Sequence, residues 1–189
     1  MVEIYILEVR LEKINPFLDF SLERNPEVLE EDWDNCYFKC YKTKEFKSLG
    51  DVFHISAERI RDMSAKPWYV GWSVCQDSVF KELSQLVSLP RFLSSNQAEG
   101  NMWIFIGTPG YGAHLHLDHD LDLPTWQAQV SGSKTWYLKP PPECAGSCPG
   151  MIQTDLHPGD MIIVNTNFWM HSTKVLDNGI SLVVTRQLS

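Results

Sequence analysis

Apolar residues in the first hundred positions recur mainly at helical spacing. From Ser78 to Leu89 they lie three or four positions apart and a proline follows, which predicts a helix. The largely polar stretch Pro16–Glu31 is expected to be helical as well, and a Ser at the start of Ser56–Met63 predicts a short capped helix. Two short apolar runs, Val52–Ile55 and Trp68–Trp72, predict strands.

Beyond residue 100 the pattern changes to short strands that are separated by turn residues. Strands are predicted over Met102–Gly107, Trp126–Val130, Lys134–Leu138, Met161–Val164 and Ile180–Thr185, with another just before His171. Many short strands with turn signals between them are typical of a sandwich or barrel. We therefore expect one structural domain of mainly β class, a jelly-roll over residues 66–189 that carries a helical cap formed by residues 1–65.

Charge and composition narrow the function classes. The 189 residues carry 16 basic and 24 acidic side chains, a net charge of −8, which argues against non-specific binding to nucleic acids. With 43% apolar and 12% aromatic residues the chain supports a full hydrophobic core and is not a disordered protein. No apolar run approaches the roughly 20 residues of a membrane span, and residues 1–11 lack the basic start of a signal peptide. A cytoplasmic or nuclear location is expected by default, with the secretory pathway as the alternative if a targeting segment has been removed.

Five cysteines leave three interpretations open. Cys75 accompanies two Cys-x-x-x-Cys pairs, and an odd number is a poor disulfide framework for a chain of this length. Free thiols are the first expectation, and local disulfides in an oxidising compartment are an alternative. A structural zinc ion is the third interpretation, although zinc-binding pairs are more often spaced Cys-x-x-Cys. Its ligands would be Cys36, Cys40, Cys144 and Cys148.

Two histidines and an aspartate form the most informative chemical pattern. In an extended segment His114, His116 and Asp118 share one face, and His171 follows on a later strand. Two imidazoles and one carboxylate on one side of a metal leave open positions for a chelating cosubstrate and O₂ on Fe(II). The pair His116-x-Asp118 alone is weak, because solvent-facing loop residues produce it by chance. A His114/His116 pair would also suit zinc or copper.

Several further motifs follow one another in order between residues 66 and 189. They are Trp68-Tyr69-Val70, Leu89–Leu93, Trp103–Gly107, His116-Leu117-Asp118, Trp126–Leu138, Pro140-Pro141, Pro158-Gly159-Asp160, Phe168–His171 and the Asn178-Gly179 turn. In this order they resemble the JmjC group of cupin-fold oxygenases that depend on Fe(II) and 2-oxoglutarate, and most of all its small protein hydroxylases. The resemblance implies a double-stranded β-helix, the jelly-roll of the cupins.

The resemblance also implies roles for individual residues. The iron ligands would be His116, Asp118 and His171. The contacts to 2-oxoglutarate would be Lys134, which pairs with the distal carboxylate, and Tyr69, Thr185 and Gln127. From the residues alone, a strand-edge lysine at the surface is the alternative for Lys134, and Tyr69 could equally be a core aromatic. The chain departs from its relatives at Ala113, where they often carry Thr, and at Gln127, where close relatives carry Asn.

The implied activity is hydroxylation of an amino-acid side chain in a protein or peptide. It would couple oxidative decarboxylation of 2-oxoglutarate to oxidation of a C–H bond, with O₂ as co-substrate and with the iron supplying the difficult chemistry. Two alternatives stay open. One is N-methyl demethylation, which begins with the same hydroxylation. The other is a catalytically inactive cupin-fold binding protein, which the departures at Ala113 and Gln127 would suit.

Overall fold

Strands dominate the part of the chain that the computed structural model describes, which is residues 6–8, 37–41, 43, 45–56, 59, 66–75, 77–86, 98–119, 123–144, 146–176 and 179–188. The strands are β1 (Ile6–Glu8), β2 (Phe38–Tyr41), β3 (Tyr69–Val74), β4 (Ala98–Gly107), β5 (Thr125–Ser131), β6 (Lys134–Lys139), β7 (Ile152–Leu156), β8 (Asp160–Val164), β9 (Met170–Val175) and β10 (Ser181–Leu188). The helices are α2 (Leu49–Phe53) and α4 (Asp77–Leu86), and Pro142–Cys144 forms a short 3-10 turn.

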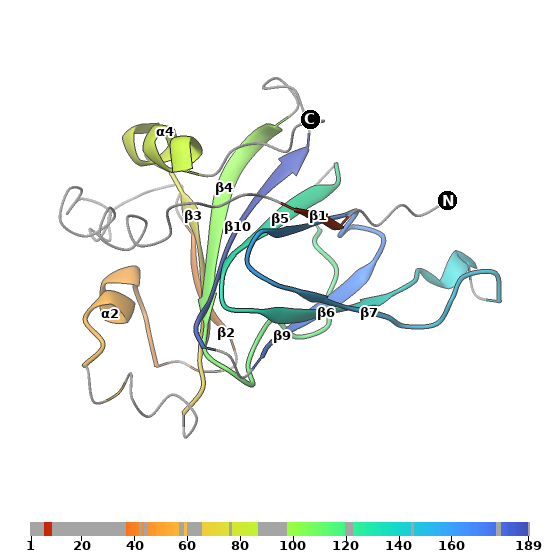
Figure 1. The fold of residues 1–189 in the computed structure, drawn as a ribbon, viewed down its shortest axis with the longest axis horizontal. Coiled ribbons are helices and arrows are strands. Elements are labelled where there is room, and N and C mark those ends of the chain that lie inside the picture. Colours follow the sequence, from red (N-terminus) through yellow and green to blue (C-terminus); the bar gives the residue numbers. More distant parts are fainter. Residues whose placement is uncertain are drawn as a thin grey trace.

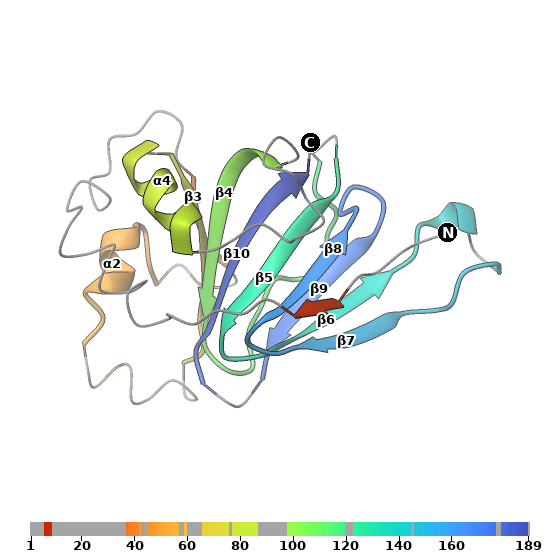
Figure 2. The ribbon, with the colours of Figure 1, turned by 45° about the horizontal axis from the view of Figure 1, so that its top comes forward.

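These strands form two antiparallel sheets. The larger sheet has seven strands in the order β1-β8-β5-β10-β4-β3-β2, and the smaller sheet has the order β7-β6-β9. The smaller sheet lies against one face of the larger sheet, while α2 and α4 lie on the opposite side of the larger sheet (Figures 1 and 2). Two facing antiparallel sheets with this strand order confirm the expected jelly-roll of mainly β class.

A further extended segment borders the smaller sheet and is central to the site. Val175 N donates to Tyr111 O, and Thr173 N donates to Ala113 O. At the end of this segment His116 and His171 exchange two main-chain hydrogen bonds, of 3.0 and 2.8 Å. The register therefore places His116 directly opposite His171. Gly112 permits the close approach, because a Cβ atom there would collide with the Thr173 carbonyl group.

The two faces of the larger sheet are both covered, and this explains its continuous hydrophobic runs. Strand β3 is buried at every position, and β5 at all positions except its ends. On the outer face Val79 and Leu83 of α4 belong to the same hydrophobic cluster as Met102 and Ile104 of β4. A second cluster lies on the other side and is formed by Trp136, Leu138, Leu156, Ile162, Val164 and Trp169. Strand β9 of the smaller sheet instead alternates between more and less buried positions, as expected where one face meets solvent.

Strand register decides which side chains face the interior of the barrel. Tyr69 lies opposite Tyr41 of β2 and opposite Gly107 of β4. Thr185 lies opposite Gln127 of β5. Residues directly opposite each other in an antiparallel pair share a face of the sheet. The interior face of the larger sheet therefore carries three of the predicted cosubstrate contacts, namely Tyr69, Thr185 and Gln127.

Most of the sequence-based element predictions are confirmed. The helix predicted from residue 78 is α4, and the predicted strands correspond to β3, β4, β5, β6, β8 and β10. The predicted helix over Pro16–Glu31 and most of that over Ser56–Met63 lie outside the described residues. No helix in the described part of the chain combines the length and apolar character that a membrane crossing requires.

Three element predictions were wrong. The apolar run Val52–Ile55 is not a strand, because Ser48 and Asp51 form a reciprocal capping box that starts helix α2 at Leu49. The strand expected before His171 begins at Met170 and runs through and beyond that histidine. The cap formed by residues 1–65 is not helical throughout, since it contributes β1 and β2 to the two edges of the larger sheet. Strand β7 was not predicted.

Candidate metal and cosubstrate site

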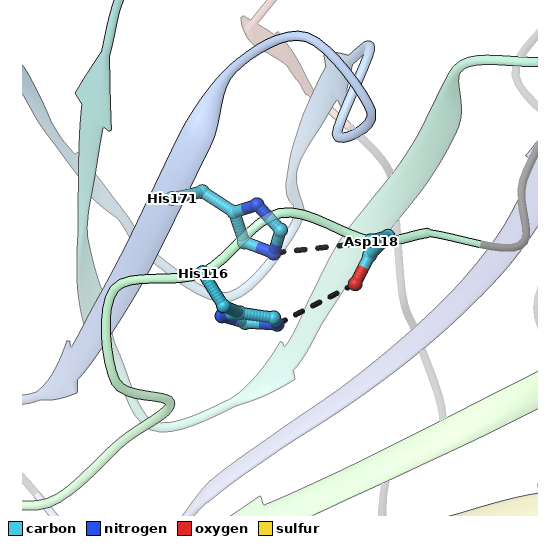
Figure 3. A group of neighbouring side chains, drawn as sticks. All are labelled: His116, Asp118 and His171. Atoms are coloured by element: carbon cyan, nitrogen blue, oxygen red, sulfur yellow. Dashed lines mark ion pairs between the residues drawn. The ribbon is translucent and has the colours of Figure 1, made fainter.

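The side chains of His116, Asp118 and His171 converge on one point (Figure 3). Their ligand atoms all lie within 4.8 Å of one another. His116 Nε2 is 3.4 Å from Asp118 Oδ1, and His171 Nε2 is 3.9 Å from Asp118 Oδ2. Within the described ranges no other group of three or more His, Cys, Asp or Glu side chains has such a geometry. The three residues predicted as metal ligands are therefore brought together by the fold.

Main-chain carbonyl groups fix the tautomer of both histidines. His116 Nδ1 lies 2.6 Å from the His114 carbonyl oxygen, and His171 Nδ1 lies 3.3 Å from the Trp169 carbonyl oxygen. A carbonyl oxygen only accepts hydrogen bonds, so each Nδ1 carries the proton. In the neutral imidazole each Nε2 then carries a free lone pair that faces the carboxylate of Asp118, whereas Nε2 of a protonated His116 donates to that carboxylate. This is the usual way in which proteins orient a metal-binding imidazole.

The electrostatics of the three residues suit a divalent cation. Burial lowers the pKa of His171 to about 4, which keeps its imidazole neutral. Burial pushes the pKa of Asp118 upward, but a hydrogen bond from His116 and the neighbouring His171 outweigh it and hold that pKa below its usual range. The hydrogen bond to Asp118 in turn raises the pKa of His116 against the effect of burial. A partly buried carboxylate between two imidazoles lacks a full counter-charge, and a divalent ion would supply it.

The donor set fits Fe(II) among the metals that proteins bind. Two imidazole nitrogens and one carboxylate oxygen on one side of an ion, with the remaining positions open, form the set used by non-haem Fe(II) oxygenases. His114 is exposed and is not part of the group. The alternative metal pair His114/His116 is therefore not supported. His114 contributes its carbonyl oxygen, which accepts from His116 Nδ1.

A buried lysine occupies the interior of the same barrel. Lys134 is fully buried, and its Nζ donates to Tyr69 Oη at 2.9 Å and to Gln127 Oε1 at 3.0 Å. Both acceptors are neutral, and in the described part of the chain no carboxylate pairs with this ammonium group. Burial lowers the pKa of Lys134 to about 7. The surface interpretation of Lys134 is thus wrong, and the pocket around it favours an anionic ligand.

Tyr69 is held against Lys134 by its surroundings. Its ring lies over Gly107, where a Cβ atom would collide with the ring carbons. Burial and the neighbouring Tyr41 raise the pKa of Tyr69, and the nearby Thr173 hydroxyl acts in the opposite direction. The phenol therefore stays protonated and can both accept from Lys134 and donate to a ligand. Thr173, on β9, was not predicted from the sequence because only the pairing of the sheets places it beside Tyr69.

The two remaining predicted cosubstrate contacts have partners within the protein. Gln127 is buried and accepts from Lys134, so it lies at the predicted place. The Thr185 hydroxyl donates to the Trp126 carbonyl oxygen at 2.5 Å. Its role toward 2-oxoglutarate stays a prediction. Thr185 nevertheless lies directly opposite Gln127, on the same face of the larger sheet.

Sequence reasoning missed two residues beside the metal ligands. The ring of Trp136 stacks on that of His171 with a centroid distance of 5.5 Å, two positions after Lys134 on the same strand. Tyr41 packs edge-on against Tyr69 with a centroid distance of 5.3 Å. Burial and the nearby charge of Asp118 both raise the pKa of Tyr41. The alternation of β6 could have indicated Trp136, whereas Tyr41 lies in a segment for which no strand was expected.

The cysteines differ from the first expectation. Cys144 and Cys148 form a disulfide with a Cα–Cα distance of 5.4 Å, and Cys75 is disulfide-bonded as well. Cys40 is a free thiol that contacts the Thr43 hydroxyl at 3.1 Å. The sulfur atoms of a disulfide are not thiolates, so the four-cysteine zinc site is not supported. Cys36 lies outside the described residues.

We compared the chain with protein-family models, with known proteins and with solved structures. No protein-family model matches the chain. A mouse (Mus musculus) protein, 2-oxoglutarate and iron-dependent oxygenase JMJD4, is 24% identical over 147 residues, which cover 59% of this chain and 34% of that protein. The chain thus spans about a third of the length of this relative.

Solved structures show the fold. The Escherichia coli ribosomal oxygenase YcfD in complex with cobalt and 2-oxoglutarate is 15% identical and has a TM-score of 0.53, covering 98% of this chain and 48% of that one. Another E. coli YcfD structure is 19% identical and has a TM-score of 0.45. This match covers 64% of this chain and 33% of that one. At these identities the structures speak to the fold alone, and the mouse relative supplies the likeness in sequence. Together with the His-Asp-His group, these findings confirm that the chain resembles the JmjC-type cupin oxygenases that use iron and 2-oxoglutarate.

Proposed function

We propose that this protein is an Fe(II)- and 2-oxoglutarate-dependent oxygenase that hydroxylates a side chain of a protein or peptide. The observation that carries the proposal is the presence of two complementary sites in one barrel. His116, Asp118 and His171 offer three ligands to a metal, and Lys134 offers a buried cation to an anion. An inactive binding protein would have no need of both.

The two sites lie on the same face of the smaller sheet, because Lys134 and Leu138 share a face of β6 and Leu138 lies opposite His171. Trp136 stacks on His171 and stands two positions from Lys134 on the same strand. The charge of Lys134 also contributes to the low pKa of His171, after the larger effect of burial. 2-Oxoglutarate carries a carboxylate at each end, so one end suits the metal and the other suits Lys134.

Each residue has a separate task in such a reaction. The His-Asp-His group would hold the iron, which when bound supplies the oxidation of 2-oxoglutarate to succinate and CO₂ and the activation of O₂. Lys134 and the phenol of Tyr69 would bind the distal carboxylate of 2-oxoglutarate. The apolar cluster that includes Trp136 and Trp169 keeps water from the interior. The chain thereby orients the reactants and shields them.

A macromolecular substrate is supported by the surface around the site. Phe168, three positions before His171, is 63% exposed, and Leu115 beside His116 is exposed as well. Large apolar side chains that stay exposed beside a site are typical of surfaces that bind another protein. A row of nearly parallel rings also leads from Tyr69 outward through Phe105 and Trp103 to Tyr37, which is 67% exposed. YcfD, whose structure shares this fold, is named a ribosomal oxygenase, which supports the proposal of a protein-associated substrate.

Turnover of 2-oxoglutarate tests the proposed activity. Protein reconstituted with Fe(II) and ascorbate in air should convert 2-oxoglutarate to succinate, which NMR spectroscopy resolves. His116→Ala should abolish succinate formation, whereas His54→Ala, at an exposed histidine away from the site, should not. Candidate protein substrates are then screened by mass spectrometry for the gain of one oxygen atom. Equal succinate formation by the wild type and His116→Ala would contradict the proposal.

A further inference from the structure

The turn between β8 and β9 orients two of the three candidate metal ligands. Asp118 N donates to the Thr166 carbonyl oxygen at 3.1 Å, and His171 Nδ1 lies 3.3 Å from the Trp169 carbonyl oxygen. The turn itself is fixed, because the amides of Phe168 and Trp169 both donate to the Asn165 carbonyl oxygen. Asp118 and His171 are therefore tied to one rigid element rather than to two independent loops.

Two buried polar atoms of this turn, Thr166 Oγ1 and Asn167 Oδ1, have no hydrogen-bond partner. Thr166 is 2% exposed, and its Oγ1 makes no hydrogen bond. Buried hydroxyl groups are nearly always hydrogen-bonded in folded proteins, so a lone one calls for an explanation. Thr166 lies next to Asp118, because the Asp118 amide donates to the carbonyl oxygen of this threonine.

We propose that Thr166 is a positioning residue whose hydroxyl donates to the Asp118 carboxylate oxygen that does not bind the metal. The inference rests on the proposed function only in that it requires a metal ion at the His-Asp-His group. In the structure the two carboxylate oxygens face different histidines, Oδ1 toward His116 and Oδ2 toward His171 (Figure 3). When one carboxylate oxygen binds a metal, the lone pairs of the other oxygen can still accept a hydrogen bond. The Thr166 hydroxyl then fixes the carboxylate as a one-oxygen ligand and leaves more coordination positions open.

Three variants separate this role from a structural one. Thr166→Val keeps the shape of the side chain and removes the hydroxyl, whereas Thr166→Ser keeps the hydroxyl. The matched control is Thr135→Val, because Thr135 is also buried and its hydroxyl donates to a carboxylate, Asp155 Oδ1 at 2.6 Å, in the β6–β7 pair. The measurements are the affinity for Mn(II) by calorimetry, the electronic absorption spectrum of the Co(II)-loaded protein, and circular dichroism to verify folding.

The proposal predicts a weakening of Mn(II) binding by about 10- to 100-fold in Thr166→Val, the range typical of lost partners of metal ligands. The Co(II) spectrum of this variant should change, Thr166→Ser should restore both properties, and Thr135→Val should resemble the wild type in both. Wild-type affinity and an unaltered spectrum in a folded Thr166→Val protein would overturn the role of Thr166 and leave the proposed function intact. If Thr166→Val does not fold, wild-type binding by Thr166→Ala decides against the role and weak binding supports it. A wild-type protein that binds no Mn(II) would contradict the metal site itself.

Discussion

The pH dependence of 2-oxoglutarate binding follows from the burial of Lys134. With a pKa of about 7, this lysine is half neutral at pH 7 and almost wholly neutral at pH 9 in the ligand-free protein. A carboxylate bound beside it stabilises the charged form, so binding above pH 7 must be accompanied by uptake of a proton. If the pKa in the complex lies well above 9, the affinity falls roughly fifty-fold between pH 7 and pH 9.

Calorimetry measures both the affinity and the proton. Mn(II)-loaded protein is titrated with 2-oxoglutarate under argon, in buffers that differ in their enthalpy of ionisation. The wild type should take up nearly one proton per ligand at pH 8 to 9. Lys134→Met, which replaces the ammonium with an apolar group of similar length, should weaken binding by roughly 2–5 kcal/mol at pH 7 and show no such uptake. Lys139→Met on the same strand, at an exposed position, is the matched control and should behave as the wild type.

The same variant should become more stable as it loses affinity. Because the folded-state pKa of Lys134 lies below its unfolded value of 10.5, the protein is destabilised while that lysine is charged, and this cost is relieved as the pH rises from about 7 toward 10.5. At lower pH the full cost is about 5 kcal/mol at most, from 1.36 kcal/mol for each pKa unit. Ligand-free Lys134→Met should therefore melt at a higher temperature than the wild type at pH 6, with the gap narrowing toward pH 9. An affinity that is flat from pH 7 to 9, together with a Lys134→Met protein that is no more stable, would refute the reasoning.

Three further predictions concern the ligands, the tyrosine pocket and the disulfide. Asp118→Asn removes the ligand charge, so calorimetry should show strongly weakened Mn(II) binding while the melting temperature of the metal-free protein changes little. Gly107→Ala should displace the tyrosine ring above it and weaken 2-oxoglutarate binding, whereas Gly150→Ala, with open space around its Cβ, should not. Replacing Cys144 and Cys148 with Ser should lower the stability by less than the roughly 3 kcal/mol expected for a 15-residue loop, and alkylation with mass spectrometry should find no free thiol at either position in the wild type.

The candidate metal ligands could be predicted from the sequence because they depend on short-range geometry and a shared motif order. A His-x-Asp pair in an extended segment places both side chains on one face whatever the rest of the fold does. Lys134 follows in the same way from the turn at Gly132, which has a positive φ of 61° and sets the phase of β6. Its burial, however, comes from the sheet that covers it.

Long-range pairing explains part of what the sequence did not reveal, and local turns and caps explain the rest. Tyr41 lies at the site only because β2 joins the edge of the larger sheet, and nothing in its local pattern indicates that partner. Val52–Ile55 has the composition of a strand, but the capping box at Ser48 decides in favour of a helix. The pairing of Cys144 with Cys148 depends on the local turn that brings their Cα atoms to 5.4 Å, which the cysteine count alone did not favour.

Water proton relaxation tests the central claim most directly, namely that a metal ion and 2-oxoglutarate occupy the barrel together. Mn(II) bound at His116, Asp118 and His171 keeps exchangeable water in its open positions and speeds the relaxation of bulk water protons. We predict that 2-oxoglutarate displaces this water and lowers the enhancement of the water proton relaxation rate. The effect should saturate at one equivalent in the wild type and be small in Lys134→Met at the same concentration. An enhancement that stays constant as millimolar 2-oxoglutarate is added to the wild type would contradict the account.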